Sequence, residues 1–296
     1  MFLRSIIIFA ALWGMSSSAP NSRIFGGQRV EPGELPYTVL IRLTRQHDLG
    51  ERLFCGTILT RQWILTAAHP VQNDVYRPDA FEVMAGKYDL WSTEYNEQSR
   101  SVREVIRHPK HTSLVIGLHD VALLMLATPL EFTEAVQPIA VDISTEYPDG
   151  VGTVTGYGTR LEDGKQTSFL MKLSVNILTI GACTNGHKFW NPSIICTDPG
   201  TCEGDSGAPL VQWRSNRWVQ IGLMSFGEQC TFYGVPTYYT YVSQYVSWIN
   251  ETLVTAKIEA TDGAVRLGAG MWLTVIGSVV FVLSAQLNTK IHAVFI

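Results

Sequence analysis

The feature that most constrains the fold is a succession of short runs rich in Val, Ile, Leu, Thr and Tyr, which extends from residue 23 to about residue 254. Gly, Pro, Asn and Asp separate the runs, a pattern typical of short strands joined by turns. Examples of such runs are residues 37–43, 63–66, 101–107, 121–126, 170–177 and 219–226. The region is therefore expected to form an all-β barrel or sandwich.

A single helix is expected at the end of this region. Apolar side chains recur there at helical spacing, at Val242, Tyr245, Val246, Ile249 and Leu253. We find no internal repeat and no long linker in the region. The predicted class is all-β with a closing helix.

Composition narrows the possible functions. With 46% hydrophobic and 16% charged residues, the chain is too apolar to be disordered. Its 22 basic and 26 acidic residues give a net charge of −4, so no nucleic-acid partner is expected. Five cysteines are too few for a disulfide-rich miniature scaffold in 296 residues, but they suffice for two disulfides and one further thiol.

Residues 1–18 have the layout of a secretory signal peptide. Arg4 precedes an apolar run of about ten residues, and small residues follow at positions 16–19. Secretion places a protein in an oxidising compartment, where cysteines form disulfides more readily than metal sites. We therefore expect an extracellular protein.

The C-terminal end contains a second apolar segment, residues 267–285, flanked by Arg266 and Lys290. A helix of this length nearly crosses the ~30 Å hydrocarbon core of a bilayer, which favours a transmembrane anchor. A lipid-anchor signal is the alternative, because Asp-Gly-Ala at residues 262–264 offers small residues for its cleavage site. The third interpretation is that this segment is the buried tail of a soluble domain. The first two interpretations tether the protein to a membrane.

Three separate segments carry side chains suited to nucleophilic catalysis. His69 ends an apolar run, Asp120 begins another, and Ser206 lies in the sequence Gly-Asp-Ser-Gly. Each alone has an ordinary structural explanation, since Gly-Ser pairs usually mark turns and an aspartate before a strand is usually a cap. Together with Ile-Phe-Gly-Gly at residues 24–27, they resemble the trypsin/chymotrypsin family of serine proteases over residues 24–253.

The resemblance implies a fold of two packed six-stranded antiparallel β-barrels, chymotrypsin-like, with a C-terminal helix. It also divides the chain into segments. In order, these are a signal peptide at 1–18, a short activation propeptide at 19–23, a serine protease domain at 24–254, a linker at 255–266, the apolar segment at 267–285 and a tail at 286–296.

A role for each candidate side chain follows from the resemblance. Ser206 is the nucleophile, His69 the base that takes its proton, and Asp120 the group that orients the imidazole and stabilises its positive charge. Backbone N–H groups of Gly204 and Ser206 form the oxyanion hole. The order His, Asp, Ser argues against an α/β-hydrolase, in which the acid and the histidine follow the serine.

Arg23 and Ile24 are similar to the activation site of this family. Cleavage after Arg23 turns the amide of Ile24 into an α-ammonium group, which is positive at neutral pH because such groups have a pKa near ~8. The resemblance implies that this ammonium pairs with Asp205, the neighbour of Gly204 and Ser206. We therefore expect a zymogen and a trypsin-like activating protease.

The specificity pocket is expected to be apolar. Trypsin-like members carry an aspartate on its floor, six residues before the nucleophile, and this chain has Gly200 there. A substrate cation would be buried without a partner, which is costly. The resemblance places the remaining lining at Thr201, Glu203, Ser225, Phe226, Gly227 and Thr237. Because Gly227 leaves the entrance open and Thr237 shortens the pocket, we expect medium or large apolar P1 residues.

The cysteines depart from the family pattern at one place. Two disulfides are implied by the resemblance, Cys183–Cys196 and Cys202–Cys230. Cys55 matches a third family cysteine, but its usual partner is replaced by Pro70. Cys55 is therefore expected to be a buried free thiol, with pairing to another chain as the alternative. Pro70 also biases His69 away from helical backbone angles.

A calcium loop of some relatives corresponds to residues 86–98. Asp89, Glu94 and Glu97 resemble its ligands, but Lys87 stands where a carboxylate is expected. Its ammonium group could neutralise Glu97 in place of the ion, so we expect no metal here.

The expected function is a secretory-pathway serine endopeptidase, acting on protein or peptide substrates without a cofactor. The alternative is a catalytically silent protease homologue that serves as a binding or adaptor module. Asn250 begins the single usable glycosylation sequon, because Asn191 is followed by proline.

Overall fold

The computed structural model describes residues 27–44, 50–158, 167–184, 191–201, 204–227 and 235–256. The expected signal peptide, the activation site at Arg23 and Ile24, and the apolar segment 267–285 lie outside these residues. Within the described ranges, no helix has both the length and the apolar character needed to cross a bilayer.

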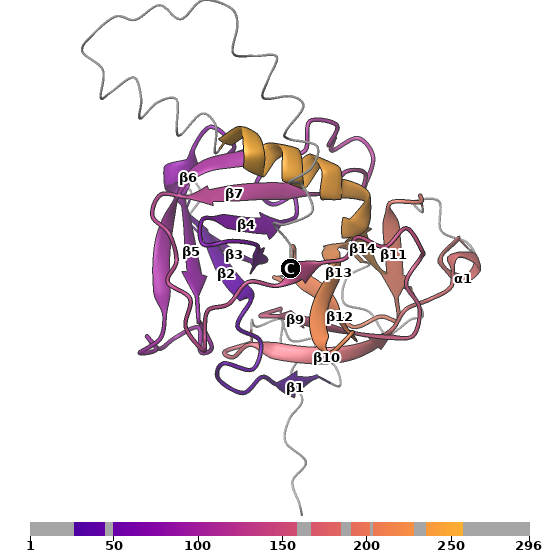
Figure 1. Cartoon of the computed structure of the whole chain (residues 1–296), viewed down its shortest axis with the longest axis horizontal. Coiled ribbons are helices and arrows are strands. Elements are labelled where there is room, and N and C mark those ends of the chain that lie inside the picture. The colour runs from indigo at the N-terminus through magenta and orange to yellow at the C-terminus, as the bar shows by residue number, and fades with distance from the viewer. Residues whose placement is uncertain are drawn as a thin grey trace, which may run out of the picture.

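Six strands form a closed barrel in the order β2-β3-β4-β7-β6-β5 (Figure 1). They span Thr38–Thr44 (β2), Glu51–Ile58 (β3), Trp63–Thr66 (β4), Phe81–Ala85 (β5), Gln98–Arg107 (β6) and Ala122–Leu126 (β7). A 3₁₀ turn, η1 (Pro78–Ala80), precedes β5. All neighbouring strands are antiparallel, and β5 closes the barrel by pairing with β2.

The alternation of side chains along β2 explains why the barrel packs on a second sheet. Val39, Ile41 and Leu43 are fully buried inside the barrel, and Leu40 is buried on the opposite face. Successive side chains of a strand point to opposite faces, so a strand buried on both must lie between two cores. Leu40 packs in the core that the barrel shares with the second sheet, together with Leu210.

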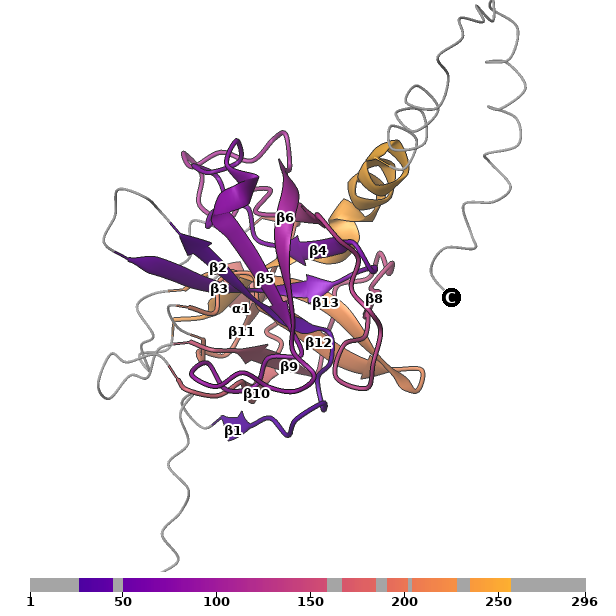
Figure 2. The same ribbon diagram turned by 90° about the vertical axis from the view of Figure 1, so that its left-hand side faces the viewer.

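The second sheet contains eight strands, with a main path in the order β1-β10-β9-β12-β13-β14-β11 and β8 paired with β13. They span Gln28–Arg29 (β1), Ala140–Val141 (β8), Val151–Gly156 (β9), Met171–Asn176 (β10), Ile194–Thr197 (β11), Pro209–Arg214 (β12), Arg217–Phe226 (β13) and Thr237–Tyr241 (β14). Figure 2 shows β9, β10 and β12 beneath the first barrel in that view.

This sheet differs from the expected second closed barrel. In the described residues, β10 and β11 are joined by an isolated bridge between Ile177 and Thr197, with a hydrogen bond of 2.9 Å from Leu178 N to Cys196 O. The ladder ends there because the chain leaves the sheet after Leu178 and forms the short helix α1 (Ile180–Thr184). The architecture is a closed barrel packed on a half-barrel.

The closing helix predicted from sequence is confirmed. A 3₁₀ turn, η2 (Val242–Tyr245), leads into a helix over residues 246–256. Ile249 and Tyr245 pack with Trp63 of β4 and Leu123 of β7, so the helix lies along the outside of the first barrel (Figure 1). Asn250 of the sequon is a half-buried residue of this helix.

Candidate active site

The three candidate catalytic segments meet between the barrel and the half-barrel. His69 follows the end of β4, Asp120 precedes β7, and Ser206 precedes β12. A backbone hydrogen bond of 2.8 Å from Cys55 N to Ser206 O joins the Ser206 segment to β3 of the first barrel. Each segment is thus held by a strand end, and the strand pairing determines how close the three come.

Hydrogen bonds connect the three side chains in series. The Oγ atom of Ser206 lies 2.8 Å from Nε2 of His69, and Nδ1 of His69 lies 2.8 Å from Oδ2 of Asp120. Pro70 is compatible with this placement, since the imidazole faces both partners. The His69 side chain remains about one-third exposed, whereas that of Asp120 is only 2% exposed.

The carboxylate of Asp120 is surrounded by donors. Its Oδ1 atom accepts the backbone N–H groups of Ala68 at 2.8 Å and His69 at 2.7 Å, and the Ser225 hydroxyl donates to Oδ2. Burial acts to raise the pKa of Asp120, but the charge of His69 and these hydrogen bonds lower it more, so the pKa lies below its ordinary value. The group is therefore ionised at neutral pH.

Two glycines shape the turn that presents Ser206. Gly204 has a φ of +95° and Gly207 a φ of +74°, which are left-handed backbone conformations that favour glycine. A Cβ atom on Gly207 would also lie 2.3 Å from the Thr66 hydroxyl and 2.4 Å from Cys55 O. The close approach of this turn to β3 and β4 thus requires glycine at position 207.

Cys55 is a free, fully buried thiol in this structure. Its Sγ atom lies 3.6 Å from Gly204 O, and its carbonyl accepts the Thr66 hydroxyl at 2.7 Å. Burial, with the nearby charge of Asp205, raises the pKa of this thiol well above its ordinary value, so the thiol is un-ionised and unreactive.

The other cysteines fall in two groups. Cys183 and Cys196 form a disulfide with a Cα–Cα distance of 5.9 Å, which ties α1 to β11. Cys202 and Cys230, expected to pair, lie outside the described residues, as does Glu203 of the expected pocket.

Asp205 is 1% exposed and lies against the backbone of residues 156–158. Gly158 N donates to Oδ1 of Asp205 at 2.8 Å. A Cβ atom on Gly156 or Gly158 would come within 2.0 or 2.2 Å of the Asp205 carboxylate oxygens. The two glycines therefore make the space in which this buried carboxylate sits.

The expected pocket residues take two different positions. Thr201 and Thr237 are buried beside one another, with 3.4 Å between their hydroxyl oxygens. A Cβ atom on Gly200 would lie 2.3 Å from Leu173 Cδ2, so an apolar side chain borders the floor position. The hydroxyl of Ser225, in contrast, binds Asp120.

Phe226 and Gly227, two further residues of the expected pocket, lie next to an aromatic pair and an open backbone position. The Phe226 ring stacks on Tyr238, with 4.6 Å between ring centroids. Gly227 is exposed, and a Cβ atom there would meet Thr237 Oγ1 only at 3.8 Å. The backbone at Gly227 thus has free space beside it.

Sequence reasoning missed several contacts that hold the site. Besides Ser225, the Thr240 hydroxyl donates to the backbone oxygen of Asp120 at 2.8 Å. The cradle of Asp205 was also missed, although the Gly-Tyr-Gly sequence at 156–158 is a usable signal for a close backbone approach. The remaining contacts cross between sheets, and one strand's sequence does not reveal its partner in the other sheet.

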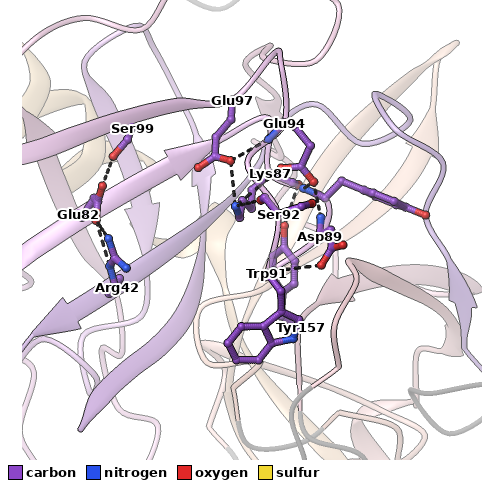
Figure 3. A network of polar contacts seen from close by, with 11 residues as sticks. Arg42, Glu82, Lys87, Asp89, Trp91, Ser92, Glu94, Glu97, Ser99 and Tyr157 are labelled. Atoms are coloured by element: carbon purple, nitrogen blue, oxygen red, sulfur yellow. Dashed lines mark hydrogen bonds and ion pairs between the residues drawn. The ribbon is translucent and has the colours of Figure 1, made fainter.

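In the loop compared above with a calcium site, the ammonium group of Lys87 lies among oxygen atoms (Figure 3). Nζ of Lys87 lies 2.9 Å from Glu97 Oε2, 2.6 Å from Ser92 O and 3.8 Å from Glu94 Oε2. Glu94 Oε1 accepts the backbone N–H of Tyr88 at 3.1 Å. These residues do not fit a calcium ion, and no group of three metal-ligating side chains occurs in the part of the chain that the structure describes.

A closed six-stranded barrel packed on a half-barrel, with a short C-terminal helix, is the chymotrypsin-like fold of serine endopeptidases. Comparison with known proteins gives the same class. The family described as Trypsin matches residues 24–249. Coagulation factor IX of Oryctolagus cuniculus is 35% identical over 247 residues, which cover 78% of this chain and 85% of that protein. The Cavia porcellus factor IX is 34% identical over 241 residues, covering 76% and 80%.

The chain therefore belongs to the trypsin family of serine endopeptidases. The family resemblance inferred from the four sequence segments is confirmed.

Replacement of Lys87 by Met should destabilise the protein, because Glu97 and Glu94 would face one another without a counter-charge. Loss of one partner of a buried ion pair typically costs about 3 kcal/mol, and we expect this decrease in the free energy of unfolding, measured by urea denaturation. Lys172→Met is the matched control, since Lys172 pairs with Glu34 at a more exposed site and should cost less than about 1 kcal/mol. Equal losses in the two variants, or a calcium-dependent melting temperature of the unmodified protein, would contradict this account.

Proposed function

We propose that the chain is an active serine endopeptidase, made as a zymogen, that uses Ser206, His69 and Asp120 as its catalytic triad. The hydrogen-bond series Ser206–His69–Asp120, with 2.8 Å at each step, is the observation that carries the proposal. A silent homologue with a binding or adaptor function has no need for an imidazole held between an alcohol and a buried carboxylate.

The geometry supports a definite path for the proton. With Nδ1–H of His69 donating to Asp120, Nε2 is free to accept the Ser206 proton as Oγ attacks the scissile carbonyl carbon. His69 then carries the proton to the leaving amine, and the ionised Asp120 stabilises the imidazolium in between. Backbone N–H groups of Gly204 and Ser206 would stabilise the oxyanion, which is typically worth ~10²–10³ in rate per donor.

Activation would act through Asp205. Cleavage after Arg23 creates the α-ammonium group of Ile24, and a buried carboxylate beside the oxyanion hole is the partner that such a group needs. The burial of Asp205 against Gly156 and Gly158 supports this assignment. A protease that cuts after arginine would be the activator.

Labelling with a fluorophosphonate tests the proposal, because this reagent reacts only with an activated serine. Protein cut after Arg23 should be labelled and should hydrolyse peptides, whereas Arg23→Gln should be secreted, uncut and unlabelled. Ser206→Ala should be cut normally but lose kcat by a factor on the order of 10⁶. Correctly cut protein that takes no label would favour the adaptor function, and full activity of Arg23→Gln would refute the zymogen switch.

The P1 preference is proposed to be apolar, of medium or large size. Gly200 offers no carboxylate, and the apolar side chain of Leu173 occupies the space that a side chain at position 200 would need. Thr237, buried against Thr201, limits the depth of the pocket. Substrates with Leu, Met, Phe or Tyr at P1 fit this lining better than Lys or Arg.

Thr237→Gly should widen the preference toward Phe and Tyr at P1. The substitution removes three side-chain heavy atoms, and a difference of one methylene in an apolar pocket already alters kcat/KM by about 10–200-fold, so we expect the Phe-to-Leu ratio to rise by about tenfold or more. Cleavage of a peptide library by the activated enzyme and by the variant measures this ratio. An unchanged ratio, or strong cutting after Lys or Arg by the unmodified enzyme, would refute the pocket assignment.

We further propose that the enzyme is secreted, carries a glycan at Asn250 and is tethered to the membrane by residues 267–285. The lack of charge in this segment supports a tether as either a transmembrane helix or a lipid-anchor signal. Release of the protein from cells by a phosphatidylinositol-specific phospholipase would identify the lipid anchor, and resistance to it would favour the helix.

A further inference from the structure

Residues 109–120 form a loop that ends at Asp120, and its two ends lie side by side at a point that we call the neck of the loop. His108 N donates to Val121 O at 3.0 Å, so residues 109–120 leave and re-enter the first barrel at one point. At this neck the rings of His108 and His119 are stacked, with 4.8 Å between centroids and 17° between planes. The two rings therefore face each other where the loop joins the residue proposed as the carboxylate of the catalytic triad.

Aromatic side chains from the C-terminal segment brace this stack. The Tyr245 hydroxyl lies 3.2 Å from Nδ1 of His119, and its ring meets the His119 ring edge-on at 5.8 Å. Tyr245 and Trp248 also pack edge-on against His108, at 5.3 and 5.0 Å. The His119 ring thus stacks on His108 with one face and contacts the Tyr245 hydroxyl through its ring nitrogen. We call this arrangement of His108, His119 and Tyr245 the histidine clamp.

His119 has an unfavourable backbone conformation that its surroundings must stabilise. Its φ is +50°, one of three positive values among the described non-glycine residues. This left-handed conformation is unfavourable for most side chains and persists only where the surroundings enforce it. Val121 N donates to His119 O at 2.9 Å, closing a tight turn around Asp120. The direction in which the Asp120 side chain leaves the backbone therefore depends on the conformation of His119.

The clamp is built from neutral rings. Nδ1 of His108 accepts the backbone N–H of Lys110 at 3.3 Å, which requires an unprotonated nitrogen. Burial, followed by the charges of His119, Lys110 and His111, lowers the pKa of His108 to about 4. Burial, with Lys110 and His111, also lowers the pKa of His119. Tyr245 is the facing titratable group from the C-terminal segment. The stack thus carries no internal charge repulsion at neutral pH.

We propose that His119 is a positioning residue for Asp120, and that the histidine clamp holds the carboxylate in line with His69. This inference rests on the proposed function, because it concerns the same site. His119 touches no reacting atom and acts only through the backbone of Asp120. Loss of the clamp should therefore lower kcat while leaving the pocket, and hence KM, in place.

His119→Ala and His119→Asn test this role in activated enzyme. Alanine removes the ring and disfavours the left-handed backbone, and we expect kcat to fall by about tenfold with KM within a factor of about two. Asparagine tolerates that backbone, and its amide oxygen can accept the Tyr245 hydroxyl, so it should restore most of kcat. Ser113→Ala, an exposed change in the same loop away from the clamp, is the control and should leave both constants unchanged.

The outcomes separate the two proposals. Active-site titration with a fluorophosphonate counts folded sites, so kcat is expressed per competent molecule; an unmodified protein that takes no label fails the proposed function itself. If unmodified enzyme is active and His119→Ala has the same kcat per site, the positioning role is refuted. Should His119→Ala fail to fold, Tyr245→Phe removes only the hydroxyl of the clamp and should lower kcat without changing KM; no change in kcat would then refute the role.

Discussion

The structure depends on one buried carboxylate that both halves of the molecule share. Asp120 accepts backbone N–H groups from the segment after β4 of the barrel and a hydroxyl from Ser225 of β13 in the half-barrel. A carboxylate buried without donors would be neutralised or expelled, so these hydrogen bonds join the two halves at a fixed distance. The same contacts leave one oxygen facing His69, and the hydrogen-bond series to Ser206 follows from that orientation.

Much of the fold could be predicted from the sequence, because short β-branched runs between turn residues have few other solutions. The closing helix was equally accessible, since Tyr245 and Ile249 recur at helical spacing. The half-open second sheet could not be predicted from the sequence. Its strand pairing stops where the chain turns into α1, and the position of that turn depends on tertiary packing. Ser225 shows the same limit at the site. Its position in the chain suggested a pocket wall, yet its hydroxyl binds an acid that lies far away in the sequence.

Cys55 is a free thiol, and hydrogen bonds rather than a disulfide hold its surroundings together. The backbone of Cys55 donates to Ser206 O and accepts from Thr66, and its thiol lies beside Gly204 O. Hydrogen bonds across β3 and β4 thus hold the turn at Ser206 close to the barrel. Pro70 restricts the backbone of His69 and so contributes rigidity of another kind.

The ammonium group of Lys87 neutralises its loop without the need for a dissolved cation. A cation attached to the chain by covalent bonds has no dissociation constant, so dilution, chelators or a low-calcium compartment cannot remove it. Its backbone oxygen accepts the Tyr157 hydroxyl at 2.8 Å, and Tyr157 lies between the glycines that border Asp205. The loop around Lys87 and the strand end beside Asp205 therefore stay joined without a bound metal ion.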